Sequence, residues 1–71
     1  MLYAANSELP PAVREHLPLH AQDIFRAAYN HAWVEYADHS DREAVAKAVA
    51  WTTVKQKYRQ VDGDWVSLDE Y

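Results

Sequence analysis

The sequence is poor in the residues from which small proteins usually build reactive or metal-binding sites. Its 71 residues include no cysteine and a single glycine. The absence of cysteine excludes a disulfide framework and a thiolate metal site, and it is consistent with a reducing compartment. One glycine cannot form a glycine-rich phosphate-binding loop, which argues against the common nucleotide-binding motifs. Any site in this chain must therefore use other residue types.

Long apolar runs are missing as well. No stretch approaches the roughly 18 apolar residues of a membrane span, and the first residues lack the basic region and apolar run of a signal peptide. We therefore expect a cytoplasmic protein without membrane insertion. The net charge of −4 argues against general affinity for nucleic acid or for anionic membranes.

Aromatic side chains are plentiful, with 3 Trp, 5 Tyr and 1 Phe. Large rings bury much apolar area per ordered residue. A chain of this length has room for one hydrophobic core, so residues 1–71 are expected to form a single domain. Within it, we expect residues 66–71 to be a frayed acidic tail.

Residues 20–36 carry the clearest periodic pattern. Their apolar residues recur at spacings of three and four, which places them on one side of a long α-helix. The predicted buried side consists of Ala21, Ile24, Phe25, Ala28, Tyr29, Ala32 and Tyr36.

A short helix is predicted before it, over about residues 10–16. Pro10 and Pro11 suit a first helical turn, and Pro18 disfavours helical geometry at the residue before it. The apolar face of this helix is expected to comprise Leu9, Val13 and Leu17.

A third helix is predicted from residue 41 or 42 to about Arg59. Ser40 and Glu43 have the spacing of a capping box, and the helix should pack antiparallel against the central one. We expect two contact rows, formed by Ala44, Ala48, Trp51 and Tyr58 and by Val45, Val49 and Thr52. A large residue at Ala48 should then be more damaging than the loss of any surface charge.

Asp62, Gly63 and Asp64 predict a turn, followed by a strand at residues 65–68. The spare extended segment is residues 2–5, so a two-stranded β clip joining the termini is expected. The predicted fold class is therefore all-α: a short N-terminal helix and two long antiparallel helices, with this small clip added.

Two blocks of the sequence resemble the ChaB family of small bacterial proteins. The blocks are LPLHAQDIFRAAYNHAW at residues 17–33 and VAWTTVKQKY at residues 49–58. The resemblance extends over about residues 2–66 and implies a ChaB-like fold. Departures include Leu2, where a proline is common, and Thr52 and Thr53, which replace a small apolar pair.

The family name proposes a role in regulating cation transport, and the resemblance implies a non-enzymatic regulator or adaptor that works by protein contact. The implied partner is the cytoplasmic side of a cation/proton antiporter. ChaB-like domains also occur beside a nucleic-acid-associated domain, so the alternative is a nucleic-acid-associated accessory domain.

The back of the central helix is the candidate protein interface, comprising Ala27, Asn30, Trp33 and Val34. Alanine and valine are poor choices for a solvated face. Either the first helix covers them or they mark a contact site for another protein.

The candidate phosphate patch lies on the third helix and comprises Lys47, Lys55, Lys57 and Arg59. Basic residues near a helix C-terminus interact favourably with the helix dipole, which is the simpler explanation. A patch that binds phosphates would lose affinity steeply as salt rises.

Metal, cofactor and catalytic sites are not expected. Pro18 separates His16 from His20, and the turn at Asp62 and Asp64 offers too few oxygens for calcium. His31 and Glu35 are best explained as a solvated pair. The serines and threonines include no nucleophile with a partnered base.

Overall fold

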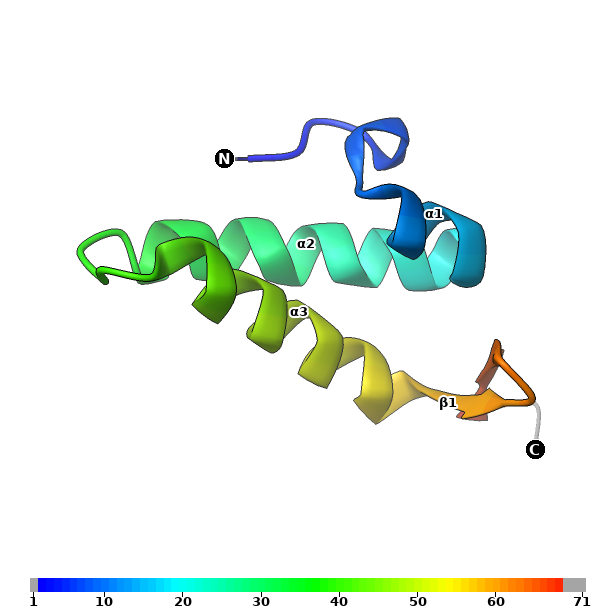
Figure 1. The fold of residues 1–71 in the computed structure, drawn as a ribbon. Coiled ribbons are helices and arrows are strands. Elements are labelled where there is room, and N and C mark those ends of the chain that lie inside the picture. The colour runs from blue at the N-terminus through cyan, green and yellow to red at the C-terminus, as the bar shows by residue number, and fades with distance from the viewer. Residues whose placement is uncertain (1, 69–71) are drawn as a thin grey trace.

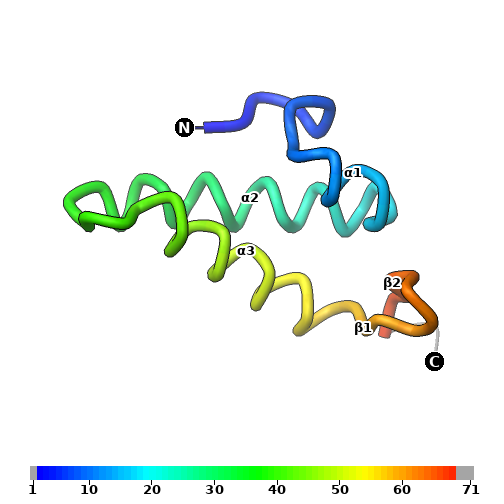
Figure 2. The backbone as a smooth tube through the Cα atoms, in the orientation of Figure 1, coloured from blue at the N-terminus to red at the C-terminus, as the bar shows by residue number. Residues whose placement is uncertain are grey.

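The computed structural model describes residues 2–68, and it is built from a helical hairpin with small elements at one end (Figure 1). The elements are, in order, the 3₁₀ turn η1 (Asn6–Glu8), α1 (Pro11–His16), α2 (Leu19–Glu35), α3 (Arg42–Lys57), β1 (Tyr58–Val61) and β2 (Asp64–Ser67). The helices α2 and α3 run antiparallel, and α1 lies beside the beginning of α2 (Figure 2). The predicted short helix and two long antiparallel helices are therefore confirmed.

Small residues let α2 and α3 approach closely, and rings fill the space around them. Ala21, Ala32, Ala46 and Ala50 are each 0% exposed. Further buried side chains on the two helices are Phe25, Tyr29 and Val54, and the ring of Phe25 meets that of Trp51 edge-on at 5.1 Å. Close-packed contact of this kind carries most of the stability of a small helical domain.

The predicted contact rows of α3 are wrong in part. Ala44, Ala48 and Thr52 are exposed, and the buried row is Ala46, Ala50 and Val54. Alanine and valine occur around most of the circumference of α3, so the spacing of apolar residues did not identify the side that meets α2. Consequently the close helix–helix contact is at Ala50 and not at Ala48.

The helix α1 meets the start of α2 at a corner. Leu9, Val13 and Leu17 are 2%, 2% and 4% exposed, which confirms the predicted apolar face. The side-chain amide of Gln22 donates to the carbonyls of Leu17 at 2.8 Å and Arg14 at 3.3 Å. These bonds satisfy carbonyls that the end of a helix leaves free.

The two strands form a hairpin with each other, so the predicted clip between the termini is wrong. The chain leaves α3 at Tyr58, and β1 pairs antiparallel with β2 across a two-residue turn. Asp62 and Gly63 both have positive φ, 53° and 88°, as the type I′ turn of a two-residue hairpin requires. Val66 and Ser67 belong to β2 and are not a frayed tail; residues 69–71 lie outside the described part.

The connection between α2 and α3 does not use the predicted capping box. The helix α3 begins at Arg42, as expected, but no side chain caps its start. Instead, the Asp41 N–H donates to Nδ1 of His39 at 3.0 Å. Arg42 donates from Nε to the carbonyl of Trp33 at 2.7 Å, and its guanidinium lies 4.0 Å from the centre of the Trp33 ring.

Candidate protein-contact surface

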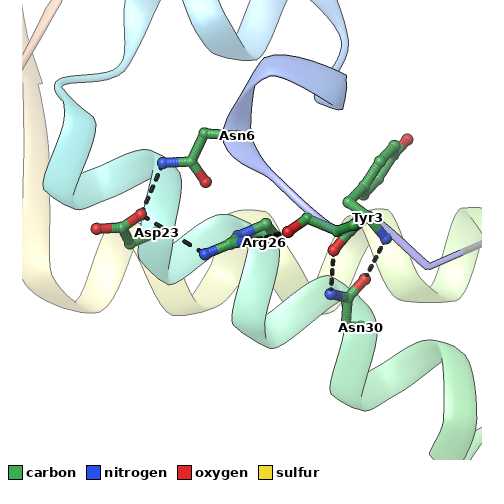
Figure 3. A network of polar contacts seen from close by, with 6 residues as sticks. Tyr3, Asn6, Asp23, Arg26 and Asn30 are labelled. Atoms are coloured by element: carbon green, nitrogen blue, oxygen red, sulfur yellow. Dashed lines mark hydrogen bonds and ion pairs between the residues drawn. The ribbon is translucent and has the colours of Figure 1, made fainter.

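Residues 2–6 lie along the outer side of α2, which is the side turned away from α3 (Figure 1). Asn30 holds them with both ends of its amide: Oδ1 accepts from the Tyr3 N–H and Nδ2 donates to the Tyr3 carbonyl, each at 2.8 Å (Figure 3). A neighbouring β-strand would offer a backbone the same donor and acceptor pair. Residues 2–6, called the N-terminal segment below, are thereby fixed without a partner strand.

Two further side chains of α2 continue this contact. Nη1 of Arg26 donates to the Ala4 carbonyl at 2.7 Å, and Nδ2 of Asn6 donates to Oδ1 of Asp23 at 2.6 Å (Figure 3). At Asp23, Arg26 and Asn30 the outer side of α2 is therefore contacted by the N-terminal segment and not by α1. The expectation that α1 covers Ala27 and Val34 is wrong, since both side chains are exposed.

Tyr3 also connects the N-terminal segment with the core. Its ring lies 4.8 Å from that of Tyr29, whose side chain is 2% exposed. Burial raises the pKa of Tyr29 to about 12, with smaller contributions from nearby Tyr3 and Glu43. The Tyr29 hydroxyl consequently stays protonated throughout the physiological range.

A shallow groove remains open between the start of the N-terminal segment and α2. It is lined by Leu2, Asn30, His31, Val34 and Glu35. Leu2 is 53% exposed and Val34 is 62% exposed, although both are large apolar residues. Ala27 is also exposed and lies two helical turns before Val34, on the same side of α2. The groove and Ala27 together form an apolar strip with polar edges, called the α2 outer strip below.

Three of the four predicted interface residues belong to this strip. Ala27, Asn30 and Val34 lie on it, and Asn30 also uses its amide to hold Tyr3. Trp33 is half-buried elsewhere, stacked on Tyr29 at 6.0 Å and covered by Arg42. Leu2, His31 and Glu35 were not predicted; the four-residue spacing of His31 and Glu35 was visible, but the position of Leu2 depends on tertiary contacts.

The strip ends in an acidic part of the molecule. Glu35 lines the groove and contacts Nε2 of His31 at 3.3 Å. Residues 31–43 contain the four acids Glu35, Asp38, Asp41 and Glu43 against Arg42, giving −3 with histidine neutral. The last turn of α2 has no basic residue, although helix C-termini favour cations there. Lys47 pairs with Glu43, so Glu35, Asp38 and Asp41 against Arg42 leave this end of α2 with a net charge of −2.

The predicted phosphate patch is not gathered on one face. Nζ of Lys47 lies 3.1 Å from Oε1 of Glu43. Lys55 and Lys57 are two residues apart on α3, and hence about 200° apart around the helix. Arg59 follows in β1. Lys47 and Lys55 lie about 80° apart around α3, but Lys57 is turned to another side and Arg59 belongs to another element, so the four cations do not share one helix face.

Two further kinds of site, metal-binding and membrane-spanning, were sought among the described residues. Within residues 2–68, no three His, Asp or Glu side chains are placed to hold a metal ion together. Over the same residues, none of the helices combines the length and the apolar character needed to cross a membrane.

Comparisons with known proteins agree on one family. The family model described as ChaB matches residues 9–67. Relatives from Escherichia coli K12 and Shigella flexneri, each named "Putative cation transport regulator ChaB", are 44% identical over 70 residues, covering 90% of this chain and 92% of theirs. The fold is similar to the "NMR solution structure of the putative cation transport regulator ChaB", with a TM-score of 0.81, 42% identity, and coverage of 92% of this chain and 96% of that chain.

Proposed function

This chain belongs to the ChaB family, and we propose that it is a non-enzymatic regulator of cation transport that works by contact with another protein in the cytoplasm. The names of its relatives support the regulatory role. The contact mechanism is our own inference from the surface of this chain, and the partner, a cation/proton antiporter, is what the resemblance to the family implies.

One observation carries the proposal: Val34 and Leu2 are both exposed and line the same groove of a very small domain. The core is formed by other side chains, among them Phe25, Tyr29 and the alanines of the α2–α3 contact, which are 0–2% exposed. An exposed leucine and valine therefore add little to the fold. Grouped apolar side chains with polar edges are typical of protein contact sites.

The alternative function, a nucleic-acid-associated accessory domain, has less support. It would use Lys47, Lys55, Lys57 and Arg59, which lie on different sides of α3 and in β1. Sequence-independent binding to nucleic acid requires cations that follow the phosphate backbone.

Site-directed photocrosslinking in native host cells tests the proposal. A benzophenone amino acid at position 34 is expected to crosslink to a membrane cation transport protein, identified by mass spectrometry. The same probe at position 19 is the matched control, because Leu19 is 73% exposed near the other end of α2. Crosslinks to the same protein from both positions, or to no transport protein from position 34, would contradict the proposed contact.

A further inference from the structure

The ends of α2 and α3 differ in a way that bears on the partner. The last turn of α3 contains Lys55 and Lys57, which oppose the negative end of its dipole. The last turn of α2 has no basic residue and contains Glu35. Arg42 already donates to the Trp33 carbonyl in this turn, but among the described residues the ion pair of Glu35 is with His31 and not with a lysine or arginine. The carboxylates of Glu35 and Asp38 therefore remain available to a cation from outside the chain.

That negative charge lies directly beside the open apolar groove. Glu35 forms part of the groove wall, and Asp38 follows three residues later in the exposed turn after α2. Arg42, the basic residue nearest in sequence, is turned toward Trp33, where its Nε is bonded and its guanidinium covers the ring. A molecule bound in the groove would therefore contact apolar side chains within it and carboxylates at its edge.

We propose that the groove binds an apolar segment flanked by lysine or arginine, supplied by the cytoplasmic border of a membrane-spanning helix in the regulated transport protein. The inference rests on the proposed function and specifies the partner's chemistry. Cytoplasmic loops of membrane proteins are rich in Lys and Arg close to their spans. Such a segment presents apolar residues to Leu2 and Val34 and its cations to Glu35 and Asp38.

An NMR titration with two synthetic peptides tests this. One is an amphipathic helix of leucine and lysine, and the other has glutamate at every lysine position. The lysine peptide is expected to shift the backbone amides of the groove residues Leu2, Asn30, His31, Val34 and Glu35. The glutamate peptide is expected to leave them unchanged. Equal binding of both peptides, or shifts centred outside the groove, would overturn the inference.

Variants separate specific recognition from general attraction to an acidic protein. Glu35→Lys should weaken binding of the lysine peptide about fivefold, the upper range for one surface ion pair. Val34→Ser, which leaves the charge unchanged, should weaken it about threefold through lost apolar contact. Glu15→Lys changes the net charge by the same amount as Glu35→Lys but lies on α1, and it should weaken binding less than twofold. Equal weakening by the two lysine variants would show that charge alone attracts the peptide and would refute the groove.

A second copy of this chain is the competing occupant. If the groove amides shift on dilution of the protein alone, the groove is a self-association site and the inference fails. The photocrosslinking result is independent of both experiments. If position 34 crosslinks to a transport protein but the lysine peptide does not bind, the proposed function stands and the inference of a basic segment fails. If the lysine peptide binds in the groove but position 34 gives no such crosslink, the groove's preference for basic segments stands and the proposed function fails.

Discussion

The two sides of α2 are stabilised in different ways. The inner side buries Ala21, Phe25, Tyr29 and Ala32 against α3 and the rings around it, by close packing. The outer side holds the N-terminal segment mainly through the polar side chains of Asp23, Arg26 and Asn30 (Figure 3). Close packing is sensitive to volume, whereas directional bonds are sensitive to the loss of single polar atoms. Beyond these bonds, the outer side leaves Val34 exposed, and under the proposed contact a substitution there would change recognition without changing the fold.

The inner side should show the largest effect. Ala50→Leu inserts a large side chain where Ala50 is 0% exposed, and we expect a loss of about 2–3 kcal/mol in the free energy of unfolding, measured by urea denaturation. The matched control is Ala48→Leu, at an exposed position of the same helix, which should change stability by less than about 0.5 kcal/mol. A larger loss of stability in Ala48→Leu than in Ala50→Leu would instead support the contact row that includes Ala48, as predicted from the sequence.

The polar contact on the outer side should contribute less. Asn30→Ala removes the donor and the acceptor that hold Tyr3, and we expect a loss of about 1–2 kcal/mol together with faster hydrogen exchange at the Tyr3 amide. Asn30→Asp keeps an acceptor for the Tyr3 N–H but sets a carboxylate oxygen against the Tyr3 carbonyl oxygen, so it should also weaken the hold on Tyr3. Unchanged exchange at Tyr3 in Asn30→Ala would show that Asn30 does not hold the segment.

Tyr29 links the two sides and gives a pH dependence. Its pKa in the folded protein is about 12, above the ordinary value of 10.0. The folded state therefore retains a proton that the unfolded state loses, so this contribution to stability is complete below pH 10 and disappears as pH rises toward 12. By pH 11 the loss should be roughly 1 kcal/mol in thermal or urea unfolding. Tyr29→Phe should lack this part of the slope, and an identical slope in both proteins would exclude Tyr29 as its source.

The inner side of α2 could be predicted far better than the outer side. The spacing of Ala21, Phe25, Tyr29 and Ala32 reflects one helix period, and that information is local. The outer side depends on residues distant in sequence, since Asn30 meets Tyr3 across 27 positions. Polar residues have no periodic signature, so the role of Asn30 was not visible.

The far end of the molecule shows the same limit. The turn at Asp62 and Gly63 was correctly predicted, but β1 was taken for the end of a helix. The segment expected to pair with β2 is instead held by α2. The sequence therefore indicated that a strand follows the turn. It did not indicate which of the two available segments, residues 2–5 or residues 58–61, would pair with that strand.

The basic residues of α3 and β1 should show the smallest effect. Because they are spread around the helix, we expect no retardation of single- or double-stranded nucleic acid in a gel shift at low salt. A salt-dependent shift that is lost in Lys55→Glu and retained in Glu15→Gln would instead support the nucleic-acid-associated alternative.

The most direct test of the central claim compares the α2 outer strip with the other end of the same helix in a transport assay. Cation/proton antiport is measured by dye dequenching in inverted membrane vesicles from the native host, with purified wild-type, Val34→Glu or Leu19→Glu protein added. Both substitutions are at exposed positions and should leave the melting temperature unchanged. We predict that wild type and Leu19→Glu change the antiport rate equally and that Val34→Glu does not. A full response to Val34→Glu, or none to wild type, would contradict the account.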